Sequence, residues 1–146
     1  MKAGLMILLG TLLMTAHASG DEIQFFDEGP LAGQGFPFSE SVRVGKLLFL
    51  SGAIGSDENG RLVEGGLEAE AMQTMKNIQE ALERRGLAMS DVVKCTIFLD
   101  DVGKWNRFNK VYVTFFEAPY PARSALGADG LALNASVEVE CIAAYP

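Results

Sequence analysis

The sequence has almost no histidine, few cysteines and a shortage of basic residues. Its 146 residues include one histidine, His17, two cysteines, and 12 basic against 19 acidic residues, for a formal net charge of −7. An acidic balance argues against nucleic acid or an anionic membrane surface as the main partner, since both attract Lys and Arg. The two cysteines, Cys95 and Cys141, lack C-x-x-C spacing and cannot by themselves complete a structural zinc site.

The first 18 residues have the pattern of a secretory signal peptide. Lys2 gives a basic start, residues 3–14 carry no charge, and Ala16-His17-Ala18 is a small-x-small cleavage pattern. This apolar run is too short to span a bilayer, which needs about 20 residues. We therefore expect cleavage after Ala18 and a periplasmic or secreted mature protein.

Removal of residues 1–18 would leave a mature chain without histidine. Such a chain excludes Ser-His-Asp and Cys-His catalysis, zinc sites with histidine ligands, and imidazole as a general base. The remainder shows no repeat, low-complexity tract or linker, so residues 19–146 are predicted to form one domain. The hydrophobic fraction of 49% is ordinary for a globular protein and too high for a disordered one.

Apolar periodicity predicts strands and helices in alternation. Strict alternation indicates strands, and a repeat of three and four residues indicates an amphipathic helix. The predicted elements are a hairpin at 41–44 and 47–52, a helix at 67–85, a strand at 92–99, a helix capped by Asp100 or Asp101, and a last strand at 136–145. In the strand at 92–99 we expect Val93, Cys95, Ile97 and Leu99 to face the core. The second helix aligns Trp105, Phe108, Tyr112 and Phe115 on one face, which we interpret as core.

This order predicts an α+β fold with two helices packed on one face of a mixed β-sheet. Right-handed crossovers place both helices on the same face of the sheet. The other face would then carry Phe98 and Ile142 without cover from the same chain. A half-apolar, uncovered sheet face indicates subunit contact, so we expect an oligomer with sheets facing each other.

Two features of the last third of the chain suggest chemistry. Arg123 follows Pro121-Ala122 among small and apolar residues, a setting for a bidentate clamp on a carboxylate. An ordinary surface arginine with a packed stem is the simpler interpretation of that spacing. Glu138 and Glu140 alternate with valines, which fits either a solvated face or a partly buried acid that transfers protons.

Together these residues resemble a known family. Pro121-Ala122-Arg123-Ser124, followed by Val137-Glu138-Val139-Glu140-Cys141-Ile142-Ala143, is similar to the signature of the Rid family, the reactive intermediate deaminases also called RidA or YjgF. The resemblance extends through almost all of the predicted mature chain in the same order. It includes Leu50-Ser51-Gly52, Asn77, Asp91-Val92-Val93-Lys94-Cys95-Thr96, and Phe108 to Phe116.

The resemblance implies a fold, an assembly and a reaction. It implies a chorismate-mutase-like homotrimer with active sites in clefts between subunits. It also implies hydrolysis of 2-imino acids, such as 2-iminobutanoate and 2-iminopropanoate, and their enamine tautomers to 2-oxo acids and ammonia, without a metal or organic cofactor. Arg123 would hold the substrate carboxylate, and Glu138 would position or activate the attacking water. The substrate-binding residues that the resemblance implies are Ser51, Gly52, Asn109, Phe38 and the backbone amide of Ala125.

Two departures from the family pattern leave an alternative open. Pro37-Phe38 stands where Pro-Tyr is common, so a phenolic hydroxyl is missing, and Ala125 stands where many members have cysteine. These changes, together with export, also fit a non-catalytic cleft that binds a small carboxylate for sensing or sequestration. RNA cleavage, attributed to some relatives, is disfavoured by the acidic charge, the missing histidine and the export signal.

The cysteines also allow two interpretations. Cys95 and Cys141 both fall on the apolar register of their predicted strands. They are either two buried thiols that act as small hydrophobes or a disulfide formed in an oxidising compartment. Because neighbouring strand positions seldom give ideal disulfide geometry, the sequence favours the thiols.

Overall fold

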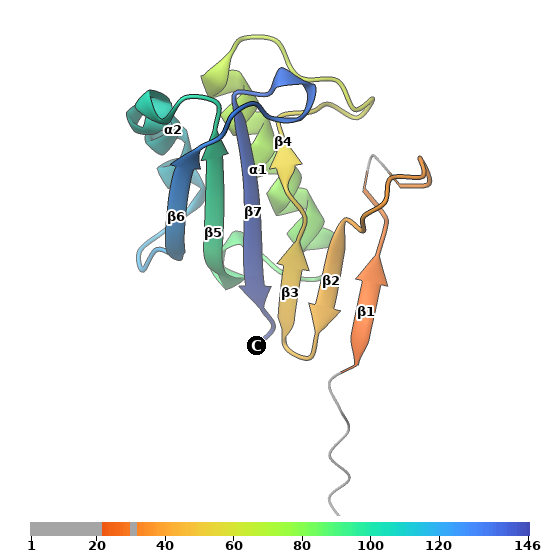
Figure 1. Ribbon diagram of the computed structural model, residues 1–146. Helices are drawn as coiled ribbons and strands as arrows, with labels where there is room; N and C mark the ends of the chain where they lie inside the picture. The colour runs from red at the N-terminus through yellow and green to blue at the C-terminus, as the bar shows by residue number, and fades with distance from the viewer. Residues whose placement is uncertain (1–21, 30–31) are drawn as a thin grey trace, which may run out of the picture.

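Seven strands form a mixed sheet, and two helices cover one of its faces (Figure 1). The computed structural model describes residues 22–29 and 32–146, so the predicted signal peptide lies outside the described residues. The strands are β1 (Ile23–Phe26), β2 (Ser41–Val44), β3 (Leu47–Leu50), β4 (Ala53–Ile54), β5 (Val92–Leu99), β6 (Ala122–Gly127) and β7 (Val137–Ala144). The helices are α1 (Leu67–Arg84) and α2 (Trp105–Tyr112), with short 3-10 helices at Met89–Asp91, Val102–Lys104, Val113–Phe115 and Ala132–Asn134.

The strand order explains why both helices lie on the same side. The sheet runs β1-β2-β3-β7-β5-β6, and the short β4 also pairs with β7. β5 and β6 are parallel, whereas the other pairs are antiparallel. β3 and β5 both run antiparallel to β7, so α1 and α2 each connect parallel strands. This confirms the predicted α+β architecture with one helix-covered face and one open face.

Helix α1 matches its sequence prediction to within one residue. Its inner stripe includes Ala71, Met75, Ile78 and Leu82, all essentially inaccessible to solvent. Gly86 follows with φ 72°, the left-handed conformation that commonly ends a helix and that glycine adopts without strain. Among the described residues, neither helix is long and apolar enough to cross a membrane.

Helix α2 is shorter than expected because a 3-10 turn precedes it. The Asp101 side chain caps that turn by accepting a hydrogen bond from the Gly103 N–H at 2.8 Å. Phe108 and Tyr112 are buried in the core, as the aromatic stripe predicted. Trp105 begins α2 and is only partly buried.

One position of β5 was predicted wrongly. Val93 was expected to share the buried register of Cys95, but it is 45% exposed, and Val92 is buried instead. The cause is a β-bulge between Val92 and Lys94, which adds one residue and shifts the side-chain alternation. Beyond the bulge the predicted alternation holds, with Ile97 and Leu99 fully buried.

The preference for two thiols was also wrong, because Cys95 and Cys141 form a disulfide. β5 and β7 are neighbours, and the two cysteines are direct register partners with their Cα atoms 4.1 Å apart. Both are buried on the helix-covered face. The bond therefore links two central strands inside the core.

Three strands were not predicted: β1, β4 and β6. Each is short, and β6 has the sequence Ala122-Arg-Ser-Ala-Leu-Gly127, without apolar alternation. Parallel pairing with β5 gives this segment its extended form. The missed β6 matters most, because it carries Arg123.

Candidate active site

Arg123 lies on the edge strand β6 and faces helix α2. It is in register with Cys95, so its side chain is on the helix-covered side of the sheet. Its Cζ lies 5.0 Å from the ring centroid of Trp105 and 4.7 Å from that of Tyr112. Both distances are within the range of a cation–π contact.

The guanidinium of Arg123 has no hydrogen-bond or ion-pair partner among the described residues. Other arginines do have carboxylate partners; Arg107, for example, donates from Nε and Nη2 to Glu68 at 2.7 and 2.6 Å. A guanidinium offers five N–H donors in a rigid fork. Arg123 is thus held by ring faces alone, and its donors remain available to a carboxylate ligand.

Asn109 and Ala125 belong to the same region. Asn109 lies on α2 four residues after Trp105 and three before Tyr112, so the three share a helix face. The Oδ1 of Asn109 and the hydroxyl of Tyr112 are buried without a hydrogen-bond partner in the described chain. Burial raises the pKa of Tyr112, and the positive charge of Arg123 opposes that effect. We call Arg123, Ala125, Trp105, Asn109 and Tyr112 the Arg123 group.

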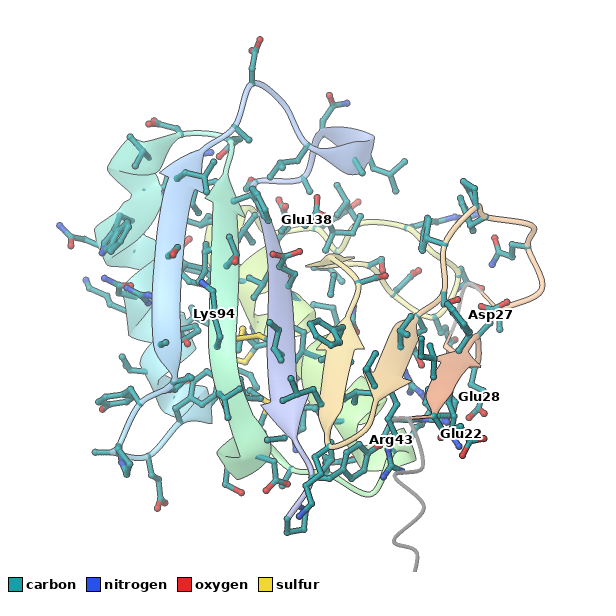
Figure 2. All side chains as sticks on the ribbon, turned by 60° about the horizontal axis from the view of Figure 1, so that its bottom comes forward. Glu22, Asp27, Glu28, Arg43, Lys94 and Glu138 are labelled. Carbon is teal, nitrogen blue, oxygen red and sulfur yellow. A yellow bond between two sulfur atoms is a disulfide. The ribbon has the colours of Figure 1, made fainter. Side chains whose placement is uncertain are left out.

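Glu138 lies on the opposite, open face of the sheet (Figure 2). It is partly buried, and burial raises the pKa of its carboxyl, with a further contribution from the negative charge of Glu140. The backbone of Gly52 comes so close that a Cβ there would overlap the Glu138 carboxyl. The Glu138 carboxyl can occupy this position because residue 52 is a glycine without a side chain.

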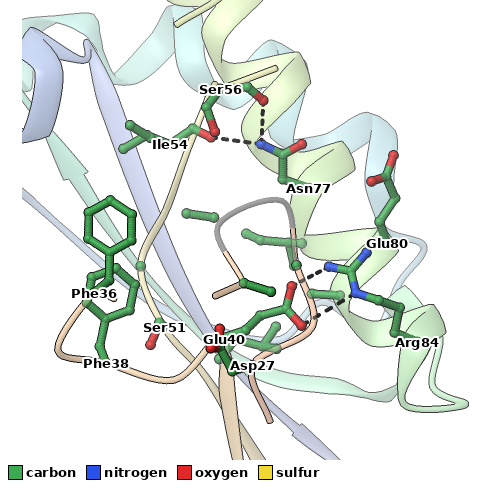
Figure 3. A pocket seen from close by; sticks show the side chains of 17 residues that line it. Asp27, Phe36, Phe38, Glu40, Ser51, Ile54, Ser56, Asn77, Glu80 and Arg84 are labelled. Carbon is green, nitrogen blue, oxygen red and sulfur yellow. Dashed lines mark hydrogen bonds and ion pairs between the residues drawn. The ribbon is translucent and has the colours of Figure 1, made fainter. Parts of the chain in front are cut away.

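Ser51 and Phe38 lie beside Gly52, around a cavity between the segment preceding β2, the β3–β4 segment and α1 (Figure 3). The Ser51 hydroxyl donates to the Ser39 carbonyl at 2.7 Å, and its N–H donates to the Glu40 carbonyl at 3.0 Å. These bonds fasten the end of β3 to the segment that carries Phe38. Phe38 is 51% exposed, and its ring centroid lies 5.4 Å from that of Phe36. We call Glu138, Ser51, Gly52 and Phe38 the Glu138 group.

Within one chain, the two groups are too far apart to share a small substrate. Arg123 pairs with Cys95 and through it with Cys141, whereas Glu138 lies three residues along β7 and points to the other face. Two strand spacings of about 4.8 Å and three residues of about 3.3 Å place the two backbone positions about 14 Å apart. The structure therefore places Arg123, Asn109 and Ala125 on the helix-covered side of the sheet and brings Gly52 against Glu138. Phe38 and Ser51 join this second set only through Gly52, because the cavity that they line lies beside α1 and its lining does not include Glu138.

The contact of Trp105 and Tyr112 with Arg123 was not predicted from the sequence. The aromatic stripe of α2 was interpreted as core, which holds for Tyr112 but is incomplete, because both rings also contact the guanidinium. The spacing of α2 could have indicated this contact. Trp105 and Tyr112 lie four residues before and three residues after Asn109, so a helix face that presents Asn109 to Arg123 also presents them.

The described residues contain no cluster of three or more His, Cys, Asp or Glu side chains that could hold a metal ion. The chemical groups in the candidate site are a guanidinium free to bind an anion, a carboxyl with a raised pKa and a serine hydroxyl. These groups can bind a carboxylate and move one proton.

Fold and site thus define an α+β protein with an arginine that packs against aromatic rings and a partly buried acid. A family model described as Endoribonuclease L-PSP matches residues 33–145, and the chain belongs to that family. This confirms the resemblance to the Rid (YjgF) family.

Individual relatives agree with this assignment. Reactive Intermediate Deaminase A, chloroplastic, from Arabidopsis thaliana is 41% identical over 91% of this chain and 71% of its own. The 2-iminobutanoate/2-iminopropanoate deaminase of Homo sapiens is 37% identical over 73% of this chain and 79% of its own. The crystal structure of E. coli TdcF with bound serine superposes with a TM-score of 0.76 at 27% identity, covering 84% of this chain and 100% of TdcF. The fold is therefore chorismate-mutase-like, as the resemblance implied.

Proposed function

We propose that this protein hydrolyses reactive 2-imino acids and their enamine tautomers to 2-oxo acids and ammonia. The observation that supports this most directly is the guanidinium of Arg123, held between aromatic rings with its hydrogen-bond donors free. A 2-imino acid presents a carboxylate next to its reacting carbon. The two relatives named as deaminases, and TdcF with its bound amino acid, support the same substrate class.

In the proposed reaction, Arg123 binds the substrate carboxylate through two parallel hydrogen bonds and fixes the iminium carbon. Glu138 accepts one proton from a water whose oxygen attacks that carbon, and the C=N electron pair moves onto nitrogen. The Glu138 carboxyl then returns the proton to the nitrogen of the tetrahedral intermediate. The C–N bond breaks, the carbonyl forms, and ammonia leaves with the remaining hydroxyl proton as ammonium. An iminium carbon is already electrophilic, so orientation and one proton shuttle suffice, and no cofactor is part of the proposal.

We further propose that the complete site forms between copies of the chain, in a homotrimer. Because Arg123 and Glu138 point to opposite faces of one sheet, a substrate that contacts both must receive them from different chains. The open face also carries apolar side chains, among them Phe49 and Leu126, which are 39% and 43% exposed. Burial of such residues against a second copy is favourable.

A coupled assay tests the proposed reaction. An amino-acid oxidase generates the imino acid in situ, and ammonia release is compared with and without the protein. We expect acceleration by the wild type and a loss of about 100-fold or more for Arg123→Ala, the typical cost of removing one partner of a buried charged pair. Arg107→Ala is the matched control, because Arg107 already has Glu68 as its partner. Equal rates for wild type and Arg123→Ala would refute the proposal.

The alternative function is carboxylate binding without turnover. Phe38 and Ala125 support it, since both replace polar groups common in the family. This alternative predicts saturable binding of a 2-oxo acid, lost in Arg123→Ala, with no acceleration of any imine hydrolysis. The same set of proteins therefore distinguishes the two functions.

We propose no nucleic-acid partner, although the matching family model carries the description of an endoribonuclease. Contact with nucleic-acid phosphates requires a basic protein surface. The net charge of −7 therefore disfavours a nucleic-acid partner. The expected result of a control assay is no cleavage of single-stranded RNA at low salt, where electrostatic binding is strongest.

We propose that the mature protein begins at residue 19 and works in the periplasm or outside the cell. The pattern of residues 1–18 supports this, as does the disulfide between Cys95 and Cys141, because such bonds persist in oxidising compartments. N-terminal sequencing of the protein recovered from a periplasmic fraction tests it. Recovery of an intact Met1 in the cytoplasmic fraction would contradict export.

A further inference from the structure

We infer that Trp105 is a positioning residue, which holds the Arg123 guanidinium for its carboxylate ligand without occupying its hydrogen-bond donors. This inference rests on the proposed role of Arg123 and extends it to a residue that would not itself contact the reacting atoms. Trp105 begins α2, and its ring centroid lies 5.0 Å from Cζ of Arg123. Tyr112 provides a second ring at 4.7 Å.

The nature of the contact explains why aromatic rings suit this task. A cation–π contact attracts a guanidinium to the face of a ring and does not use its N–H groups. Hydrogen bonds, in contrast, are donated by those N–H groups. A carboxylate partner would consume the same donors that a substrate needs, as Glu68 does for Arg107 in a two-bond fork. Aromatic rings can therefore orient the Arg123 guanidinium and leave its N–H donors free for a carboxylate.

The two rings differ in how firmly the core holds them. Tyr112 is 3% exposed, and its ring lies 5.7 Å from Phe108 and 4.7 Å from Phe116. Its place is set by the core, so its substitution would disturb the fold as well as Arg123. Trp105 is only partly buried and lies at the start of the helix. Its substitution therefore tests positioning more cleanly.

The first measurement uses the sole tryptophan of the chain as a reporter. Because Trp105 is that tryptophan, its emission reports the environment of Arg123. We expect 2-oxobutanoate, a product-like carboxylate, to change the emission of the wild-type protein in a saturable way. Arg123→Met should shift the emission of the free protein and abolish the response to 2-oxobutanoate. Identical emission spectra of the free wild type and Arg123→Met would overturn the inference, and this measurement requires no change at Trp105.

The second measurement compares Trp105→Leu with Trp105→Phe. Leucine keeps apolar bulk without a ring, and phenylalanine restores a ring. A cation–π contact contributes an amount that corresponds to about a 3- to 30-fold change in affinity. We expect Trp105→Leu to raise the Kd for 2-oxobutanoate, measured by calorimetry, within that range, and Trp105→Phe to restore most of the affinity. With imino acid as substrate, KM should rise more than kcat falls.

The outcomes separate this inference from the proposed function. If the wild type hydrolyses no imine but binds 2-oxobutanoate through Arg123, the proposed reaction fails and the binding data still decide the role of Trp105. A Kd for Trp105→Leu equal to that of the wild type would refute the positioning role, whatever the deaminase activity. Absence of 2-oxobutanoate binding by the wild type would refute the inference about Trp105, whereas the proposed reaction is decided by ammonia release alone. Equal losses in Trp105→Leu and Trp105→Phe would also refute the positioning role.

Discussion

The Arg123 group and the Glu138 group lie on the same sheet but surround side chains of opposite charge. Arg123 packs against ring faces and has no carboxylate partner among the described residues. Glu138 is partly desolvated beside another acid, and both effects raise the pKa of its carboxyl. The first group suits the binding of an anion, and the second suits the holding and release of a proton. Their separation on two faces shows that one copy of the chain does not bring Arg123 and Glu138 to the same small ligand.

The comparison predicts complementation between inactive variants. Arg123→Ala and Glu138→Gln should each lose about 100-fold or more of kcat/KM, because one removes the anion clamp and the other the proton acceptor. When the two variants are unfolded together and refolded as mixed oligomers, random assembly should restore about a quarter of the wild-type activity, since about a quarter of the clefts receive both intact residues. The measurement is ammonia release before and after mixing. If mixed oligomers are confirmed by mass spectrometry and activity stays at the level of the single variants, both residues act from the same chain.

The close approach of Gly52 to Glu138 gives the next prediction. Gly52→Ala should lower kcat/KM by about 10- to 100-fold, because the new methyl group displaces the Glu138 carboxyl and a small misplacement of a reacting group is costly. Gly127→Ala is the control: a Cβ there would meet Val102 at an ordinary 3.5 Å. Steady-state kinetics of both variants check this. Binding of 2-oxobutanoate by the Arg123 group should change less than turnover in Gly52→Ala.

The disulfide predicts a change in stability that is larger than the change in activity. Replacing both Cys95 and Cys141 by alanine should lower the free energy of unfolding by about 2–4 kcal/mol, as expected for the removal of a native cross-link. At 25 °C the activity of the folded fraction should stay within about threefold of the wild type, because both cysteines are buried in the core and outside the two groups. Urea unfolding at equilibrium measures the first quantity. An unchanged unfolding midpoint would show that the bond is absent from the native protein.

The smallest expected effect is on pH dependence. If deprotonated Glu138 accepts the proton from water, kcat/KM should fall on the acid side with an apparent pKa above the ordinary glutamate value of 4.5. Glu140→Gln removes the second of the two causes that raise the pKa, so the acid limb should move to lower pH. Glu83→Gln, on an exposed position of α1, serves as the control. An acid limb that stays in place in Glu140→Gln would contradict the coupling between the two acids.

The same raised pKa predicts a stability difference with a defined sign. A carboxyl whose pKa is higher in the folded state favours folding while it is protonated, and this contribution is lost as the pH rises through the folded pKa. Glu138→Gln should therefore raise the melting temperature at pH 7, and the difference from wild type should shrink as the pH falls below 4.5. Thermal unfolding at several pH values measures it. A lower melting temperature for Glu138→Gln at pH 7 would contradict the direction of the pKa change.

Local patterns predicted some elements well and others not at all. The stripe from Leu67 to Leu82 and the alternation from Val137 to Ala143 have strong periods, so helix α1 and strand β7 could be predicted from the sequence. Strand β6 has no period of its own, and its extended form depends on pairing with β5. The bulge at Val93 likewise arises from the fit between two strands, which a single strand's sequence does not encode.

In the candidate site, too, some features could be predicted from the sequence and others could not. Arg123 and Glu138 were identified through their sequence context, because family motifs preserve residue types at fixed spacings. That the two lie on opposite faces depends on the register of three strands, which no motif states. The contact of Arg123 with Trp105 also depends on where α2 packs. The candidate residues could thus be proposed from the sequence, whereas their distribution over the two faces of the sheet could not.

The bond between Cys95 and Cys141 has a consequence for the folding of β7. A slip of one residue between two strands exchanges the faces on which their side chains lie, and in this strand it would bring Glu138 into the core and Val139 to the open face. Once the sulfurs are joined, that slip is forbidden, because the two cysteines must remain opposite each other. The bond therefore fixes the alignment of β5 and β7 in which Glu138 faces outward and Val139 is buried.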